Sequence, residues 1–393
     1  MKYFSRILSI LILAVGGLVG GLGACNGLLG VPCNDDDPGC NASLFLLQFI
    51  AATRTNNFGT HAYVVDGTAN VKSYTVDRTT GLLTAGGQLN ISSNPEDAQV
   101  DATGNFLYVG NVATSDGLYA YSLAADPAQP VALTGSPFLA GVSRPTELSL
   151  DRANNRIYAA LQANQAEGYA IDAATGAISL LSGSPFGVGC ITTVEYNSAT
   201  SPTFASYRYG VNEFQSFSID SATGTVSALQ SFPSAFIPAQ LDYSPDGNFL
   251  YVTNAVAGLE NVLIAQINAD GTFTTASGSP VAFGPTNEQA IDLDVSASGS
   301  LVYVANSTTN GVYSYSIDTS TGAMTSLGAP ITTAAGLSAL KLSPDDQYLY
   351  AGHGTGITIY SVGTSGALTE VGSISGLTNV ENIVFRQQSE TLF

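Results

Sequence analysis

The stretch SPDGNFLYVTNA, which runs from Ser244 to Ala255, places a tight turn directly before an apolar strand. Ser-Pro-Asp-Gly is a turn sequence, because Pro fixes one backbone angle and Gly tolerates a positive φ. The segment that follows is apolar on successive positions, so both of its faces are expected to be covered by protein. Asn254 marks the point where the chain leaves the core. The stretch therefore predicts a hairpin whose second strand packs between two neighbouring layers.

Tyr251 of this stretch belongs to a repeat. Equivalent positions are Tyr63, Tyr108, Tyr158, Ala205, Tyr251, Tyr303 and Tyr350, separated by 45, 50, 47, 46, 52 and 47 residues. Periods of this size are typical of propeller blades and other repeat arrays. We therefore expect seven copies of one structural unit.

Each unit contains the same parts in the same order. A short alternating strand, such as Gln240-Leu241-Asp242-Tyr243, precedes the turn and the marker strand. A third strand reads YTVD, YAID, FSID or YSID, and a Thr-Gly hairpin signal follows it. A fourth strand closes the unit, often with Gly-Ser-Pro after it. One four-stranded antiparallel sheet cannot bury both of its faces, whereas seven arranged radially can. The prediction is an all-β protein, a seven-bladed β-propeller of four-stranded blades over residues 58–393.

The ring of blades has to close between the two ends of this region. Residues 382–386, Asn-Ile-Val-Phe-Arg, match the first strand of a unit, while the first unit lacks a clean first strand of its own. The tail is therefore expected to complete the N-terminal blade. Residues 44–50 are an alternative for the same place.

The combination of SPDGNFLYVTN with a later IDxxTG resembles the YVTN-type, lactonase-like seven-bladed propellers. That group includes bacterial 6-phosphogluconolactonase of the propeller type, and the resemblance covers roughly residues 58–393. It implies the same fold, and a lactone-hydrolysing site of His, Arg and Glu side chains around the mouth of the central channel. In this sequence, Arg208 and Glu213 are the residues that match the basic and acidic side chains of such a site.

The composition limits the partners. The 393 residues include 30 acidic and 11 basic side chains, which gives a formal net charge of −19. Such a field repels nucleic acid and anionic lipid, so nucleic-acid binding is excluded. The acidity serves solubility, or it attracts a cationic or metal-ion partner.

Residues 1–24 are predicted to be a secretory signal peptide, with a basic start, an apolar segment over residues 7–19 and small residues after it. Leu22-Gly23-Ala24-Cys25 resembles the bacterial lipobox, which implies removal of the signal and lipidation of Cys25. An ordinary signal peptide is the alternative. The lipobox reading implies a lipid-anchored linker over residues 25–57 and a location at a membrane of the bacterial cell envelope. Asn26, in place of Asp, favours the outer membrane.

Cysteine use agrees with export. Cys33 and Cys40 bracket an acidic, turn-rich loop, which a disulfide is expected to close outside the cytoplasm. The three aspartates between them are either a solvated turn or ligands for a hard cation. Cys190 has no His or Cys near it in the sequence, so a buried, inert thiol is expected there.

Two columns of the repeat are expected to surround one mouth of the central channel, because a first strand begins and a second strand ends on the same face of a propeller. The start-of-strand column is Asp97, Glu147, Thr193, Gln240, Asp292, Ala339 and Asn382. The end-of-strand column is Asp66, Asn111, Leu161, Arg208, Asn254, Asn306 and His353. Small ligands usually bind where polar groups converge in such a concave site. Alternatively, the Asn residues cap turns and the carboxylates are only hydrated.

From these columns we predict ligand-binding residues and catalytic residues. The ligand-binding set is Asp66, Asp97, Glu147, Gln240 and Asn382, and the catalytic set is His353, Arg208 and Asp292. Asp97, Glu147 and Asp292 together would suit a cation, with Ca²⁺ as the candidate, and no other cofactor is indicated. His353 is either a general base near a carboxylate or a polar turn residue.

Two functions are consistent with these features. The first is a binding or interaction module: a rigid acidic propeller tethered to the envelope membrane by its N-terminal lipid, with an unidentified protein or small-molecule partner. The alternative is a lactone hydrolase that acts at the mouth of the channel.

Overall fold

The computed structural model describes residues 59–386, except for 69, 92–93, 113–116, 139–144, 162–164, 188–192, 198–202, 208–211, 235–236, 255–260 and 283–288. The chain divides into two units, Met1–Asn56 and Asn57–Phe393, and every described residue lies in the second. The predicted signal peptide and all four cysteines (Cys25, Cys33, Cys40 and Cys190) lie outside the described residues. Across the described ranges the chain forms strands and no helix that could cross a membrane.

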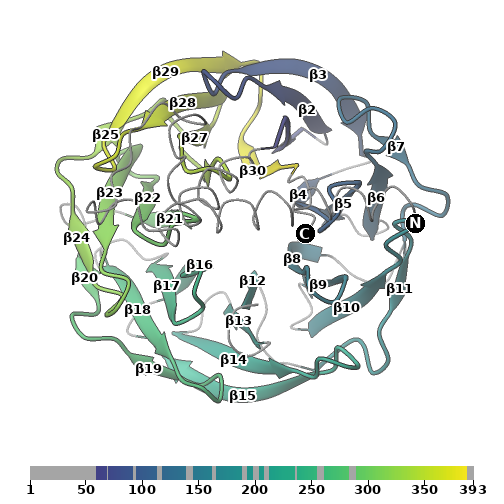
Figure 1. Ribbon diagram of the computed structural model, residues 1–393, viewed down its shortest axis with the longest axis horizontal. Helices are drawn as coiled ribbons and strands as arrows, with labels where there is room; N and C mark the ends of the chain where they lie inside the picture. Colours follow the sequence, from purple (N-terminus) through teal and green to yellow (C-terminus); the bar gives the residue numbers. More distant parts are fainter. Residues whose placement is uncertain are drawn as a thin grey trace, which may run out of the picture. The chain divides into compact units, whose positions relative to one another are not determined.

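Seven antiparallel sheets surround a central axis (Figure 1). From the axis outward, blade 1 is β30 (Val380–Phe385), β1 (His61–Asp66), β2 (Asn70–Val76) and β3 (Leu83–Asn90). Blade 2 is β4 (Pro95–Val100), β5 (Phe106–Asn111), β6 (Leu118–Ser122) and β7 (Val131–Ala132). Blade 3 is β8 (Pro145–Asp151), β9 (Arg156–Leu161), β10 (Gln165–Ile171) and β11 (Ile178–Leu180). Blade 4 is β12 (Thr193–Asn197), β13 (Thr203–Tyr207), β14 (Glu213–Ile219) and β15 (Val226–Pro233).

The remaining three blades follow the same order. Blade 5 is β16 (Pro238–Tyr243), β17 (Phe249–Asn254), β18 (Asn261–Ile267) and β19 (Phe273–Thr275), with β20 (Val281–Ala282) also paired to β18. Blade 6 is β21 (Ala290–Val295), β22 (Leu301–Asn306), β23 (Gly311–Ile317) and β24 (Met324–Ser326), with β25 (Ile331–Thr332) also paired to β23. Blade 7 is β26 (Ala339–Leu342), β27 (Tyr348–His353), β28 (Gly356–Val362) and β29 (Leu368–Ser375). The predicted seven-bladed propeller is confirmed.

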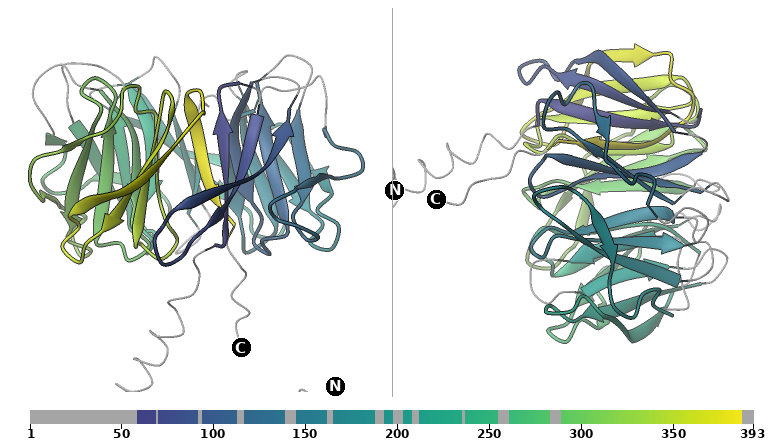
Figure 2. Two further views of the ribbon diagram at one scale, coloured as in Figure 1. Left: turned by 90° about the horizontal axis from the view of Figure 1, so that it is seen from above. Right: turned by 90° about the vertical axis from the view of Figure 1, so that its right-hand side faces the viewer.

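The ring closes through the C-terminal strand. β30 pairs antiparallel with β1, so that Tyr63 lies opposite Val384 and Val64 opposite Ile383. Figure 2 shows this yellow strand beside the purple strands of blade 1. The prediction that the tail completes the N-terminal blade is confirmed, and the alternative, residues 44–50, lies outside the described residues.

The seven marker residues lie on the second strand of each blade, and all are 0 % exposed. On β5, β17 and β27 every residue is buried, because the neighbouring blades cover both faces of the sheet. This is the arrangement that the uninterrupted apolar run in SPDGNFLYVTNA predicts.

The hydroxyl group of each marker tyrosine joins its blade to the next one. The hydroxyl donates a hydrogen bond to a backbone carbonyl oxygen of the next blade. The donor and acceptor residues are Tyr63 and Pro127, Tyr108 and Gly176, Tyr158 and Gly224, Tyr251 and Gly322, Tyr303 and Gly366, and Tyr350 and Gly81. The five glycines have φ between +72° and +79°, a conformation that suits Gly. A Cβ at Gly176 would lie 2.2 Å from the Phe106 ring. The hairpin glycine therefore serves both the turn and the contact between blades.

The Gly-Ser-Pro segments also have a structural role. Their serine hydroxyls accept hydrogen bonds from backbone N–H groups of the third strand: Ser136 from Ala120 at 3.0 Å, Ser184 from Gly168 at 3.1 Å, and Ser279 from Ile264 at 2.8 Å. Each segment thus satisfies a donor that the short fourth strand does not reach.

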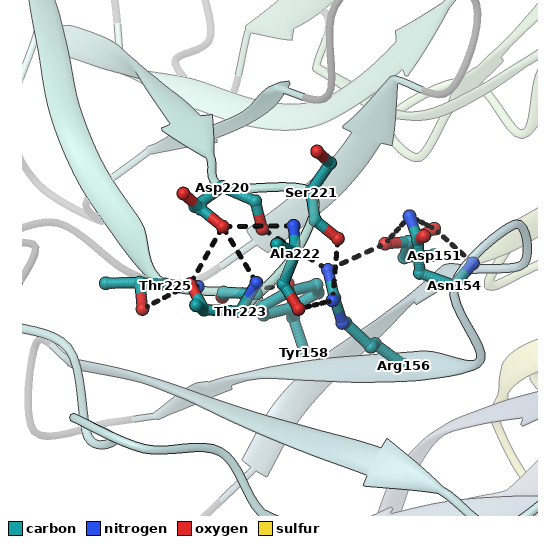
Figure 3. A network of polar contacts seen from close by, with 10 residues as sticks. Asp151, Asn154, Arg156, Tyr158, Asp220, Ser221, Ala222, Thr223 and Thr225 are labelled. Carbon is teal, nitrogen blue, oxygen red and sulfur yellow. Dashed lines mark hydrogen bonds and ion pairs between the residues drawn. The ribbon is translucent and has the colours of Figure 1, made fainter.

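Arg156 joins blade 3 to blade 4, and Figure 3 shows its contacts with the outer hairpin of blade 4. At the equivalent position, four other blades carry the apolar or aromatic side chains of Phe106, Phe249, Leu301 and Tyr348. Its guanidinium donates to the carbonyl oxygens of Ser221 at 2.8 Å and Ala222 at 3.0 Å, in the outer hairpin of blade 4. The fully buried Asp151 lies 3.7 Å from the guanidinium and balances its charge. A rigid, five-donor fork suits several carbonyls at once.

The junction between blades 4 and 5 has no marker hydroxyl, because Ala205 replaces Tyr. The rings of Phe214 and Phe273 lie there with centroids 5.3 Å apart, and Phe232 packs 5.0 Å from Phe214. The side chain of Gln230 accepts from the Phe273 N–H at 2.6 Å and donates to its carbonyl at 3.2 Å. Aromatic packing and one amide therefore replace the tyrosine contact.

Candidate functional site in the central channel

The inner strands of the blades enclose a channel with a cavity of about 630 Å³. Its described lining comes from β4, β8, β16, β21, β26 and β30 and their adjoining turns; the side chains of β12 are not described. Small-molecule sites usually have volumes of about 300–1,000 Å³, so the cavity is large enough for a sugar-sized ligand.

Several of the inner strands carry a β-bulge near the first residue. The pairing register shifts between Pro95 and Asp97, between Pro145 and Glu147, and between Ala290 and Asp292. It shifts in the same way where β30 pairs with β1, opposite Val65 and Asp66. A bulge leaves one residue unpaired and changes the direction of its side chain.

Two of the bulged residues are carboxylic acids on adjacent blades. Glu96 is the extra residue of β4 and Glu381 that of β30, and both line the cavity. Burial, and then the charge of Glu381, raises the pKa of Glu96. Burial also raises the pKa of Glu381. The bulges thus bring two mutually repelling acids to the start-of-strand end of the channel, which we call the mouth.

Asp97 and Asp292 connect neighbouring blades at this mouth. Asp97 accepts from the N–H of Ala98 at 2.8 Å and from the N–H of Leu148, on the next blade, at 2.7 Å. Asp292 accepts from Leu293 at 2.8 Å and from Leu340, on the next blade, at 2.6 Å. Burial raises the pKa of both carboxyl groups, and that of Asp292 to about 7, although the N–H donors oppose the shift.

A second set of charged residues lies two positions further along the strands. Asp242 accepts from the N–H of Val295 at 2.7 Å, and Asp294 accepts from that of Leu342 at 2.5 Å. Lys341 Nζ lies 2.7 Å from Asp294. Burial, and then the charge of Asp294, raises the pKa of Asp242. These three residues were not among the predicted site residues, although alternation along a strand places positions i and i+2 on the same side.

Two amide side chains, those of Gln240 and Asn382, also lie at the mouth. Gln240 Nε2 lies 3.5 Å from Glu147 Oε1, at the limit of a hydrogen bond. Asn382 Oδ1 is buried and has no hydrogen-bond partner. All five described residues of the start-of-strand column with polar side chains, namely Asp97, Glu147, Gln240, Asp292 and Asn382, line the cavity, as predicted. The side chain of Thr193 is not described.

The end-of-strand column lies one strand farther from the axis. None of its described members lines the cavity, so the expectation that both columns surround the mouth does not hold for them. Asp66 is fully buried, pairs with Lys72 at 2.9 Å and accepts from the Thr68 N–H. Asn306 caps a turn by accepting from two N–H groups, as the alternative interpretation predicted.

His353 and Arg208 are the two remaining catalytic predictions from that column. The ring nitrogens of His353 lie 3.4 Å from the hydroxyls of Thr355 and Thr358, and burial lowers the pKa of the ring. Arg208 lies outside the described residues. Glu213 accepts from the Ser231 hydroxyl at 2.7 Å and does not line the described cavity. Catalytic roles for His353 and Arg208, and ligand binding by Asp66, stay predictions.

The predicted Ca²⁺ gains no support from the described part of the chain. No group of three or more His, Cys, Asp or Glu side chains is arranged there to hold a metal ion. Asp97 and Asp292 each already accept two backbone N–H bonds, which leaves fewer lone pairs for a cation. The Ca²⁺ site stays a prediction.

Comparisons with known proteins agree with the fold. The family model described as "Lactonase, 7-bladed beta-propeller" matches residues 209–335. A Lactobacillus plantarum protein of known structure is 20 % identical, with a TM-score of 0.69 over 83 % of this chain and 99 % of that one. No curated protein matches by sequence.

Two further similar structures have names that mention a lactone. The periplasmic gluconolactonase of Pseudomonas aeruginosa is 16 % identical, with a TM-score of 0.67 over 83 % of this chain and 98 % of that one. A Bacteroides fragilis protein, provisionally assigned as a 6-phosphogluconolactonase, is 17 % identical, with a TM-score of 0.70 over 84 % and 98 %. The protein has a lactonase-type seven-bladed propeller fold, and the resemblance stated from the sequence is confirmed at that level.

Proposed function

We propose that the protein is a hydrolase that opens lactones, cyclic esters of hydroxy acids, at the mouth of its central channel. The observation that carries this proposal is Asp292, a cavity-lining carboxyl group whose pKa burial raises to about 7, beside Lys341 on the next blade. The lactonase family match and the gluconolactonase with the same fold support the reaction class. They favour hydrolysis over a binding module without catalytic activity.

Asp292 suits the role of general base. Its two N–H bonds fix the carboxylate, and each oxygen keeps a lone pair for a water molecule. A pKa near the working pH leaves much of the group ionised and still basic enough to accept a proton. The water oxygen forms a bond to the lactone carbonyl carbon while Asp292 takes its proton. The ring C–O bond then breaks, and the proton returns to the departing ring oxygen.

Lys341 supplies positive charge near this step. Its ammonium group pairs with Asp294 and lowers the pKa of Asp292 by charge. Positive charge held in place near the carbonyl stabilises the oxyanion that forms during attack. Asn382 Oδ1 and the Gln240–Glu147 pair would accept hydrogen bonds from the hydroxyl groups of a sugar lactone.

Hydrolysis of glucono-1,5-lactone by the purified full chain, followed as proton release above the spontaneous rate, tests this proposal. Asp292→Asn should reduce kcat/KM by about 10²-fold or more, the usual scale for a lost general base. Asp97→Asn is the matched control, because Asp97 makes the same two N–H bonds at another blade junction. Equal losses in both variants would mean that Asp292 acts as Asp97 does, by joining blades or binding the ligand, and not as the general base. A wild-type protein that hydrolyses no lactone would reject the function.

For the cellular location, we propose a lipid anchor on Cys25 and exposure outside the cytoplasm, with the outer membrane favoured by Asn26. The lipobox-like Leu22-Gly23-Ala24-Cys25 supports this location.

A further inference from the structure

The described lining of the channel carries more acid than base. Seven of these residues are acidic, from Glu96 and Glu381 at the mouth to Asp242 and Asp294 further along, and two are basic. The excess is local, because the carboxylates converge on one cavity from blades 1, 2, 3, 5 and 6.

The two cations of this lining lie further along the strands than Glu96 and Glu381, and each already has a partner. Lys341 Nζ lies 2.7 Å from Asp294. Arg152 donates to the carbonyl oxygen of Val100 at 3.0 Å. Arg152 follows Glu147 by five residues, which is about 16 Å along a strand. Within the described lining, the bulged glutamates Glu96 and Glu381 therefore have no basic side chain at their own level, and Lys341 lies two positions further along the strands, beside Asp292 and Asp294.

We infer that this channel selects uncharged lactones against phosphorylated ones and repels the anionic product of the reaction; the inference rests on the proposed lactone hydrolysis. A phosphoryl group would bring a charge of about −1.5 to −2 into the field of the carboxylates. One like charge at about 10 Å weakens binding by about 2- to 15-fold, for an effective dielectric constant between 80 and 20. An uncharged lactone avoids this penalty.

The same field acts on the product. Hydrolysis converts a neutral ester into a hydroxy acid, which loses its proton at neutral pH and becomes an anion. The anion then lies beside Glu96 and Glu381, which repel it toward solvent. Burial, and then the charge of Glu381 on the adjacent blade, raises the pKa of Glu96, and both effects also disfavour an additional anion at this place. Weak inhibition by product is the expected result.

Glu96→Gln and Glu381→Gln separate this field from the catalytic group, because neither residue takes part in the proposed proton transfer. Glu370→Gln is the matched control, an exposed glutamate on the outer strand β29. Rates are measured with glucono-1,5-lactone and with its 6-phosphate, at about 20 and 200 mM salt, where screening differs strongly.

The wild-type protein should prefer the uncharged lactone by about 10-fold or more at low salt, and high salt should narrow the preference. Each mouth variant should raise kcat/KM for the phosphorylated lactone by about 2- to 15-fold and strengthen inhibition by gluconate, while Glu370→Gln changes neither. Equal rates for the two lactones, or a preference for the phosphate, would overturn the inference.

A binding measurement decides the question even if no lactone is hydrolysed. The probes are gluconolactam, which has a stable amide ring, and its 6-phosphate, titrated calorimetrically into the full chain. Absence of hydrolysis alone rejects the proposed function. Tighter binding of the uncharged lactam, with the gap reduced in Glu96→Gln, supports charge selection. Binding of the phosphate as tightly as the lactam, or binding of neither, rejects it.

Discussion

The hydroxyl of Tyr350 donates a hydrogen bond of 2.7 Å to the carbonyl oxygen of Gly81, across 269 residues of chain. Tyr350 lies in blade 7 and Gly81 in the outer hairpin of blade 1, so this bond crosses the junction where the ring closes. The same contact joins Tyr303 to Gly366 at an internal junction. The Tyr-to-Gly hydrogen bond that joins consecutive blades therefore also joins blade 7 to blade 1, where the ring closes.

Tyr350→Phe should lower the free energy of unfolding by about 1–2 kcal/mol, because the change removes a net hydrogen bond and leaves a buried carbonyl without its donor. Urea denaturation followed by circular dichroism measures the loss. Tyr303→Phe is the matched change at an internal junction and should cost a similar amount. If neither variant is destabilised, the tyrosine hydroxyls do not hold the blades together.

Arg156→Lys should also lower the free energy of unfolding by about 1–2 kcal/mol. Lysine keeps the charge near Asp151 but cannot reproduce the planar fork that reaches the carbonyls of Ser221 and Ala222. Arg78→Lys, at an exposed position in the outer hairpin of blade 1, is the control and should change stability by less than about 0.5 kcal/mol. An equally stable Arg156→Lys protein would mean that charge alone suffices at this junction.

The blade architecture could be predicted from the sequence because its signals are local and repeated. The turn, the apolar strand and the Thr-Gly hairpin occur in nearly every unit, so each copy of the repeat supports the same predicted strands and turns. The closing strand could be predicted as well, because residues 382–386 match a first strand that blade 1 lacks. The contacts between blades could not, since a Tyr hydroxyl and a Gly carbonyl about 65 residues apart show no pattern until the blades are packed.

The candidate site was predictable only in part. The start-of-strand column was placed correctly, because equivalent positions of a repeat lie at equivalent places in the ring. The bulges at Glu96 and Glu381 were missed, since a bulge is an irregularity of pairing between two strands. Asp66 and His353 were predicted to line the channel, but they lie on second strands, one strand farther from the axis. Two residues at the same end of a blade can lie at different distances from the channel.

Stability should fall as the pH rises from about 4 to about 7. An aspartate in the unfolded chain has a pKa of about 3.9. In the folded protein, the pKa of Asp292 is about 7. Between these values the folded protein binds the additional proton, so its stability decreases with pH by at most about 1.4 kcal/mol per pH unit for each such group. Asp97 and Asp242 shift in the same direction.

Urea titrations at pH 5, 6, 7 and 8 measure this slope, and Asp292→Asn should remove part of it. Asp77 and Asp318, whose pKa values are lowered by turn hydrogen bonds, should cause a separate loss only below pH 4. Stability that stays flat or increases between pH 5 and 7 would contradict the burial of ionisable groups in the channel.

Cys25→Ser should release the protein from the membrane fraction. A lipidated N-terminal cysteine is the proposed anchor, and a serine cannot carry the thioether-linked lipid. Fractionation of cells that express the two forms measures the change, with Cys190→Ser as the matched control. A Cys25→Ser protein that is processed normally and still sediments with membranes would show that another feature provides the attachment.

The rate of lactone hydrolysis should fall below pH 7. Asp292 accepts a proton only in its ionised form, so kcat/KM should follow ionisation of a group with a pKa of about 7 and reach a plateau above it. Initial rates from pH 5 to 8.5, corrected for spontaneous hydrolysis, measure this profile. Glu96→Gln should shift the midpoint only slightly, because Glu96 is not among the main influences on the pKa of Asp292. Asp292→Asn should remove the dependence together with most of the rate. A rate that rises toward low pH would mean that the protonated carboxyl acts as an acid, and the proposed direction of proton transfer would be wrong.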